Sequence, residues 1–252
     1  MKVFLCDDTY DDILTAIYDA WETALSVGHE QVSIRKRPFC DFTLFDEVIE
    51  VTADSEKAEK VIRSVARKIS PMARYWVDMA LLHSDPDSVN IVYSFLRKGF
   101  RYGSSVCSRL NDPDIMKMMD MQRKVSGESY HLLEFARFNN VGNVYISHLE
   151  PIHNTLLMIA DHFADRMPSE NFILIDDNRR FAVVHPKDEE NYIRYLTPED
   201  FEQLAVSEKI EDGYTSMWRT YFDAIAIEER TNLRCQMSHF PKYKRKHATE
   251  WM

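Results

Sequence analysis

The sequence lacks the residues and motifs that mark well-known catalytic sites. It has only 6 glycines among 252 residues and no Walker A loop or GxGxxG turn, which excludes the familiar nucleotide-binding loops. Its 4 cysteines are far apart, so there is no CxxC pair, zinc ribbon or three-cysteine iron–sulfur cradle. GxSxG and HExxH motifs are also missing. We therefore expect unpaired thiols in a reducing compartment and no bound cofactor or metal ion.

Long hydrophobic runs are missing as well. No run of about 18 apolar residues occurs, which argues against a transmembrane helix. Near the start, Asp7 and Asp8 interrupt the chain before it can build the apolar region of a secretory signal. The composition, 45% hydrophobic and 29% charged, is typical of a globular protein. We expect a soluble, cytoplasmic protein without membrane contact.

Charge is unevenly distributed along the chain. Residues 229–252 contain six lysines and arginines and two glutamates, a balance of +4, whereas the whole chain carries −10, which leaves −14 on residues 1–228. A basic end on an acidic body is typical of a contact with a polyanion, but it is equally typical of a solvated tail or of a strip bound to the protein's own acids.

Apolar spacing predicts an α+β fold: a small antiparallel sheet of hairpins with a packed helix, flanked by helical N-terminal and C-terminal regions. Residues 1–125 are expected to be mainly helical with two short strands, at 2–6 and 47–52. Asp7, Asp8 and Thr9 are candidate caps for a helix over 10–25, and Asp54 and Ser55 for a helix over 56–69. Methionines between 116 and 121 form a row that we interpret as core.

Residues 126–197 are expected to form the hairpin region. Two strands, 131–140 and 143–152, are joined around Gly142, and a second pair, 172–176 and 180–185, follows a helix over 155–166. A further short strand is expected over 192–196. Residues 198–252 are predicted to be helical over 199–206 and 214–229, with a basic tail. All three regions are also compatible with one domain.

Several stretches resemble one bacterial family. They are residues 7–16, 128–131, 135–138, 145–151, 162–166 and 173–177, followed by Trp218, Arg230, Asn232, Gln236, Pro241, Tyr243 and Glu250. The chain is similar to the "probable DNA metabolism protein" family, which is linked to a radical-SAM protein of DNA repair or modification. A related domain precedes uracil-DNA-glycosylase-superfamily domains. The resemblance implies a radical-SAM partner and contact with DNA, and the absence of a glycosylase motif implies an accessory part.

Three polar residues form the candidate catalytic group Glu128, His131 and Asp176. On the predicted strand over 131–140, His131 and Arg137 would share a face, with Glu128 just before it. A carboxylate can orient an imidazole as a general base, and a guanidinium can hold a phosphate. The same Glu–His–Arg set can also satisfy itself and fix the hairpin.

Two further polar sets suggest metal ligands. Asp176 and Asp177 stand together at a tight turn, which is common for turn chemistry and also compatible with a divalent ion. His148, His153 and His162 lack the spacing of three or four that aligns ligands on a helix. We interpret these residues as turn, cap and surface groups.

The candidate nucleic-acid contacts lie in the basic C-terminal stretch, except for Arg137. They are Arg137, Arg230, Asn232, Lys242, Tyr243, Lys244, Arg245 and Lys246. Cations neutralise phosphates, and an aromatic ring stacks on an unpaired base. The sequence thus favours an accessory nucleic-acid-associated protein. A nucleic-acid-processing enzyme using Glu128, His131 and Asp176, and a protein-interaction module without nucleic acid, stay open as alternatives.

Overall fold

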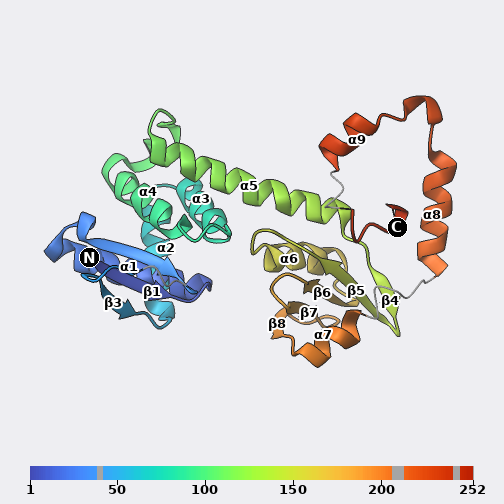
Figure 1. Ribbon diagram of the computed structural model, residues 1–252, viewed down its shortest axis with the longest axis horizontal. Helices are drawn as coiled ribbons and strands as arrows, with labels where there is room; N and C mark the ends of the chain where they lie inside the picture. Colours follow the sequence, from blue (N-terminus) through green and yellow to red (C-terminus); the bar gives the residue numbers. More distant parts are fainter. Residues whose placement is uncertain (39–41, 206–212, 241–244, 252) are drawn as a thin grey trace. The chain divides into compact units, whose positions relative to one another are not determined.

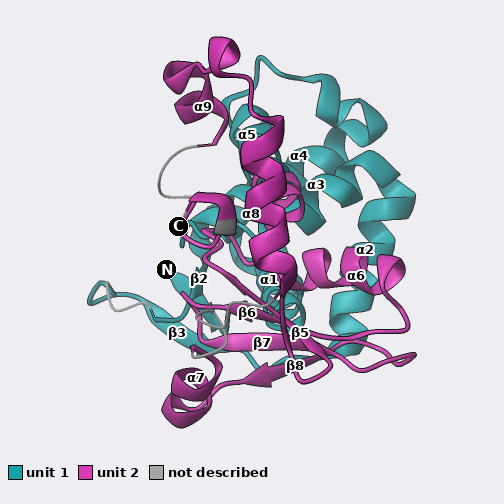
Figure 2. Cartoon of the chain, turned by 90° about the vertical axis from the view of Figure 1, so that its right-hand side faces the viewer, with its two compact units in different colours: residues 1–127 teal, residues 128–252 magenta. Residues whose placement is uncertain are grey.

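The computed structural model describes residues 1–38, 42–205, 213–240 and 245–251. The chain forms two compact units, unit 1 (residues 1–127) and unit 2 (residues 128–252), which are described separately (Figure 2). Helices and sheets occur in both units, so the predicted α+β class is confirmed. Among the described residues, no helix combines the length and the apolar character needed to cross a bilayer.

Unit 1 contains a three-stranded parallel sheet with strand order β2-β1-β3 (Figure 1). The strands are β1 (Lys2–Cys6), β2 (Val32–Lys36) and β3 (Glu47–Glu50). The helices are α1 (Tyr10–Val27), α2 (Ser55–Lys68), α3 (Pro71–Leu81), α4 (Ser88–Tyr102) and the first part of α5 (Pro113–Phe135). Short 3-10 helices cover His29–Gln31 and Gly103–Ser108.

Side-chain caps define where the first helices of unit 1 begin. Thr9 accepts a hydrogen bond from the Asp12 amide at 3.2 Å, and Asp54 accepts from the first amides of α2. Of the candidate caps, Thr9 and Asp54 therefore fill this position in the structure. Ser70 caps α3 in the same way, with Pro71 at the first helical position, where the missing N–H costs nothing.

The core of unit 1 is one continuous cluster that includes β1, β2 and all its helices. Met118, Met119 and Met121 of α5 are buried in it, so the methionine row is core, as predicted. The sequence pattern missed β2, because its end carries Arg35 and Lys36. In the fold, Lys36 is buried but its ammonium lies 3.0 Å from Asp8 and 3.1 Å from the His83 carbonyl, which balances its charge.

Unit 2 contains a five-stranded sheet with the order β4-β5-β6-β7-β8. The strands are β4 (Asn139–Val141), β5 (Val144–Leu149), β6 (Asn171–Asp176), β7 (Phe181–His185) and β8 (Tyr192–Tyr195). Both predicted hairpins form, but the sheet is mixed, because β5 and β6 run parallel. Helix α6 (Leu156–Arg166) connects these two neighbouring strands. Parallel neighbours need such a crossover connection, because the chain must return to the end of the sheet where the first strand began.

The two faces of this sheet carry different helices. Leu149, Phe172 and Leu174 pack with α6 on one face. On the other face, Ile146 and Ile175 pack against residues of α7 (Pro198–Ala205). Because side chains alternate along a strand, every position in β5 and β6 is assigned to one helix or the other.

The expected strand over 131–140 is wrong for its first half, because α5 continues through Gly127 to Phe135. One glycine inside a helix costs only about 1 kcal/mol relative to alanine. Leu132 and Leu133 offset that cost by packing against the core of unit 2. His131 therefore lies on a helix, and Arg137 follows the helix instead of sharing a strand with it.

The C-terminal part of unit 2 is helical, as expected. Its elements are α8 (Gly213–Ile225), α9 (Leu233–His239) and 3-10 helices at Glu228–Arg230 and Thr249–Trp251. Helix α8 ends four residues before the predicted limit at 229. Asn232 caps α9 by accepting a hydrogen bond from the Cys235 amide at 3.0 Å.

Candidate functional site

The candidate site is a pocket in unit 2, at the end of β5. Its cavity volume is about 70 Å³. Its lining residues are Glu128, His131, Leu132, Phe135, Leu149, Glu150, Ile152, Phe240 and His247. They come from the second half of α5, the end of β5 and the C-terminal segment, a name used here for the described residues 240 and 245–251. The pocket thus joins an apolar floor to several titratable groups, which is typical of ligand sites.

The parallel pairing of β5 and β6 brings polar residues to one edge of the sheet. His148 is in register with Ile175, and Leu149 with Asp176. Since side chains alternate, His148, Glu150 and Asp177 belong to the same face of the sheet, the face that carries α7. The Asp177 amide also donates to the Leu149 carbonyl at 3.0 Å, which fixes the chain where β6 ends.

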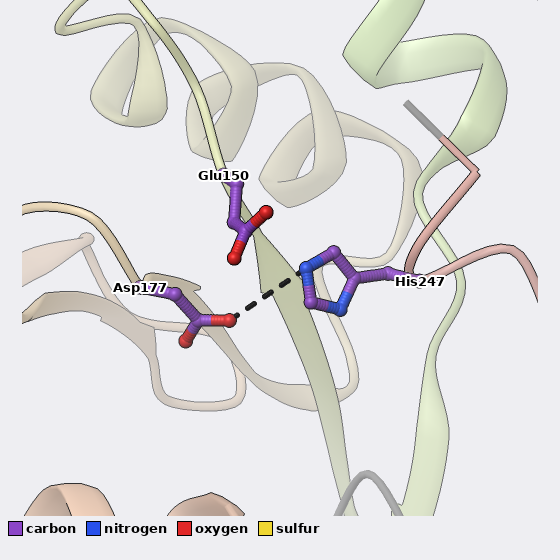
Figure 3. Close-up of side chains that lie close together, drawn as sticks. All are labelled: Glu150, Asp177 and His247. Carbon is purple, nitrogen blue, oxygen red and sulfur yellow. Dashed lines mark ion pairs between the residues drawn. The ribbon is translucent and has the colours of Figure 1, made fainter. Parts of the chain in front are cut away.

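Asp177 lies between two histidines. The His148 ring contacts Asp177 through Nδ1, 2.9 Å from Oδ1, and contacts the Leu204 carbonyl through Nε2 at 3.2 Å. A carboxylate and a carbonyl only accept, so a ring nitrogen makes either of these contacts by donating. On the other side, His247 Nε2 lies 3.7 Å from Asp177 Oδ2 (Figure 3).

Glu128 is held by the backbone and does not orient His131. Its two carboxylate oxygens accept from the amides of Ile152 at 2.8 Å and His153 at 2.7 Å. It therefore fixes the loop that follows β5. The contact spans 24 residues of sequence, which is why no local pattern revealed it.

His131 shares the pocket with Glu128 but has other close neighbours. Its Nδ1 is 3.9 Å from Glu134 Oε2, and its ring stacks on Phe135. Phe135 in turn stacks on Phe240, with ring centroids 3.8 Å apart. His131 is thus the edge of an aromatic stack that brings α5 and the C-terminal segment together.

Asp176 and Asp177, adjacent in sequence, have different surroundings. Asp176 is fully buried and accepts from the Arg179 amide at 2.8 Å and from Arg179 Nη1 at 2.9 Å. Burial raises the pKa of the Asp176 carboxyl, and its contacts with Arg179 offset the rise only in part. The same guanidinium donates to the Pro151 and Ile152 carbonyls, so this pair also fixes the loop after β5.

Arg137 pairs with the C-terminal segment. Its guanidinium donates to Glu250 at 2.6 and 3.2 Å, and the Trp218 indole donates to the same carboxylate at 3.1 Å. Burial alone would raise the pKa of the Glu250 carboxyl, but the hydrogen bonds and charge of Arg137 hold this pKa below its ordinary range. Arg137 also lies over the Trp218 ring at 5.5 Å.

The described part of the basic tail contacts unit 2 itself. Arg245 stacks on Trp251 at 4.0 Å and donates to the Phe240 carbonyl at 2.8 Å, and Lys246 pairs with Glu150. Arg230, in contrast, is exposed, and Asn232 serves as the cap of α9. The other candidate contacts, Lys242, Tyr243 and Lys244, lie outside the described residues.

Helix α8 carries a row of exposed aromatic side chains that the sequence pattern did not single out. Tyr214, Trp218 and Tyr221, here called the aromatic row, are spaced by four and three residues and therefore share one helix face. All three are exposed, Tyr214 by 75%. The available signal was a helix whose apolar residues are too numerous for one buried stripe.

Of the three histidines considered as ligands, only His148 lies near other candidate ligands. His153 is buried after the loop that Glu128 fixes, and His162 is exposed on α6. Glu150 and His247 were not predicted as site residues. An alternation of His148 and Glu150 was visible in the sequence, but its meaning depends on β6 as a parallel neighbour.

Comparison with known families identifies residues 86–250 as a match to the family described as a domain of unknown function, DUF4130. Because this match covers more than half of the chain, the chain belongs to that family. The matched range includes all the lining residues of the pocket and the aromatic row. A search of curated proteins found no match.

Proposed function

We propose that this member of the family is a nucleic-acid-associated accessory protein of a DNA repair or modification system in the cytoplasm. The resemblance of its motifs to the "probable DNA metabolism protein" family adds a radical-SAM protein as its partner. The observation that carries the proposal is the exposed aromatic row of α8. Aromatic side chains stack on unpaired bases with about 1–3 kcal/mol per base.

Charge favours unpaired bases over duplex as the bound form. The chain as a whole carries −10, which repels a phosphate backbone at long range. Stacking does not depend on net charge, and local cations need only compensate the phosphates beside the stacked bases. The exposed Arg230 is the described cation that we assign to this role, since Arg137 is already paired with Glu250.

The enzyme alternative has less support from the site. Both oxygens of Glu128 accept backbone hydrogen bonds, and Asp176 is buried behind Arg179. Neither carboxylate is therefore placed to exchange a proton with a substrate. The alternative of a protein-interaction module is favoured by one observation, the exposed apolar residues Met217 and Ile225 on α8.

The proposal is tested by the affinity of the full chain for a fluorescent single-stranded DNA oligonucleotide. Replacing Tyr214 and Tyr221 together by alanine is expected to weaken binding by about 10-fold or more, at low and at high salt, because stacking is lost. Charge reversal at Lys242 and Lys244 is expected to weaken it mainly at low salt. Tyr195→Ala is the matched control, since Tyr195 on β8 is also 75% exposed.

Three outcomes would contradict the proposal or favour another class of function. They are that the wild-type chain does not bind the oligonucleotide, that the double variant binds it like wild type, or that Tyr195→Ala loses as much affinity as the double variant. Co-purification with the radical-SAM protein, with and without nuclease, separates the remaining possibilities. A complex that persists after nuclease, together with no DNA binding by the chain, favours the protein-interaction module.

A further inference from the structure

Three side chains of unit 2 converge where β5 and β6 end. Glu150 follows β5, Asp177 follows β6, and His247 comes from the C-terminal segment (Figure 3). One potential ligand atom of each lies within 4.8 Å of the others. We propose that Glu150, Asp177 and His247 bind a divalent transition-metal ion of the zinc class. This inference goes beyond the proposed function and does not depend on nucleic acid.

The donor set determines the class of ion. Two carboxylate oxygens and one imidazole nitrogen suit zinc and its neighbours, whereas Mg²⁺ and Ca²⁺ favour oxygen ligands alone. Ligand atoms of a tetrahedral zinc site lie about 3.4 Å apart, given bonds of about 2.1 Å. The 3.7 Å between His247 Nε2 and Asp177 Oδ2 is close to that separation. All three ligand atoms lie within 4.8 Å of one another, so closing on an ion takes side-chain shifts of no more than about 1.4 Å in any pair.

A second, independent feature supports the site: Asp177 is oriented by the buried His148. The contact at 2.9 Å involves Oδ1 of Asp177, while the other oxygen, Oδ2, lies nearest His247. In metal sites, ligating carboxylates are commonly held by such hydrogen bonds. The backbone bond from the Asp177 amide to Leu149 restricts the same residue further.

The charges of the site also explain how it is balanced without metal. Lys246 pairs with Glu150 and compensates the charge of that carboxylate, while Asp177 accepts from His148. The Lys246 side chain is 57% exposed, so its ammonium can move into solvent when an ion takes Glu150. Lys246 is therefore a competitor of the metal, and its removal should strengthen binding.

The proposed ion would be reachable from the pocket. Glu150 and His247 both line the pocket, and three protein ligands leave a zinc ion at least one further position for water or another ligand. Structural zinc sites, by comparison, use four protein ligands. The site would also fasten the C-terminal segment to the sheet, since His247 belongs to that segment.

The test is a calorimetric titration of the metal-stripped full chain with ZnCl₂, without nucleic acid. All proteins carry Cys235→Ser, because the exposed Cys235 thiol can also bind zinc. We expect one ion per chain, and at least about 10-fold weaker binding for both Glu150→Gln and His247→Ala. Lys246→Ala is expected to bind more tightly than the parent. His162→Ala is the control, an exposed histidine outside the cluster, and should bind as the parent does.

A second measurement keeps the test independent of folding defects. Zinc should raise the melting temperature of the parent and of His162→Ala, and much less that of Glu150→Gln or of the near-isosteric Asp177→Asn. The proposal is overturned if the parent shows no saturable 1:1 binding. It is also overturned if Glu150→Gln and His247→Ala, with melting temperatures like the parent's, bind zinc unchanged, or if His162→Ala loses as much affinity as they do.

Discussion

The two units differ in how they use their apolar residues. Unit 1 gathers them into one cluster around a parallel sheet, whereas unit 2 divides them between the two faces of a mixed sheet. In unit 1 the most exposed apolar side chains, Leu44 and Phe45, lie in the loop before β3, but in unit 2 a whole row lies on helix α8. The comparison teaches that unit 2 presents ordered apolar surface, which in a globular protein marks a contact site.

The units differ in their ionic contacts too. In unit 1, the buried Lys36 at the end of β2 pairs with Asp8, which closely follows the neighbouring strand β1. In unit 2, Glu250, His247 and Lys246 join the C-terminal segment to residues at least 70 positions earlier. The C-terminal segment is therefore joined to the rest of unit 2 in part by ion pairs with distant residues, whereas the core of unit 1 is a cluster of apolar side chains.

The largest expected effect comes from truncating each core. Phe95→Ala in unit 1 and Phe172→Ala in unit 2 remove fully buried rings, and each should lower the free energy of unfolding by about 3–5 kcal/mol. Each change should lower the melting transition of its own unit, as measured by differential scanning calorimetry. A single transition that both variants shift equally would show that the two units unfold together, which would contradict the description of two separate cores.

An intermediate effect is expected from Glu250→Gln. The change removes the charge that pairs with Arg137 and should cost about 1.5–3 kcal/mol at neutral pH. Because folding lowers the pKa of Glu250, its stabilisation is complete above the ordinary carboxyl value of 4.5 and is lost as the pH falls through the lowered value. Proteolysis and tryptophan fluorescence of the C-terminal segment at pH 7 and below pH 4 measure this loss.

The control for this change is Glu170→Gln, an exposed carboxylate of unit 2 outside the C-terminal segment. It should leave both the stability at pH 7 and the acid-induced release of the segment unchanged. If Glu250→Gln releases the segment over the same pH range as wild type, another group controls its attachment.

The smallest effect is expected from Met217→Gln on α8. The Met217 side chain is 67% exposed, so the free energy of unfolding should change by no more than about 0.5 kcal/mol in urea denaturation. A decrease of about 2 kcal/mol or more in the free energy of unfolding would mean that other residues cover this face of α8. Unit 2 would then no longer differ from unit 1 in presenting apolar surface on a helix.

Much of the fold was predictable because its signals are local. The caps Thr9 and Asp54, the methionine row and both hairpins depend on residues that are near one another in sequence. The errors arose where distant contacts override a local signal. Gly127 indicated a break, but packing of Leu132 and Leu133 continues α5, and the cations of β2 hid a strand whose charges are paired in the fold.

The candidate site was less predictable for the same reason. Asp177 and His148 were noted individually, but what unites them with Glu150 is the parallel register of β5 and β6, and His247 is 70 positions from Asp177. Of the expected set of Glu128, His131 and Arg137, the first two line one pocket from α5, whereas Arg137 follows the helix and pairs with Glu250. Local sequence thus identified residue types suited to chemistry, whereas the topology decided which of them meet.

The two neighbouring carboxylates at the end of β6 depend on the alignment of a single strand. Asp176 belongs to the α6 face and Asp177 to the α7 face, because consecutive side chains point to opposite sides. A slip of β6 by one residue would exchange the faces of the two carboxylates. Asp177 would then lie on the α6 face, and Asp176 would lie on the α7 face beside the histidines. Insertions or deletions in β6 are therefore the natural lesions that would abolish the site while leaving every one of its residues in the sequence.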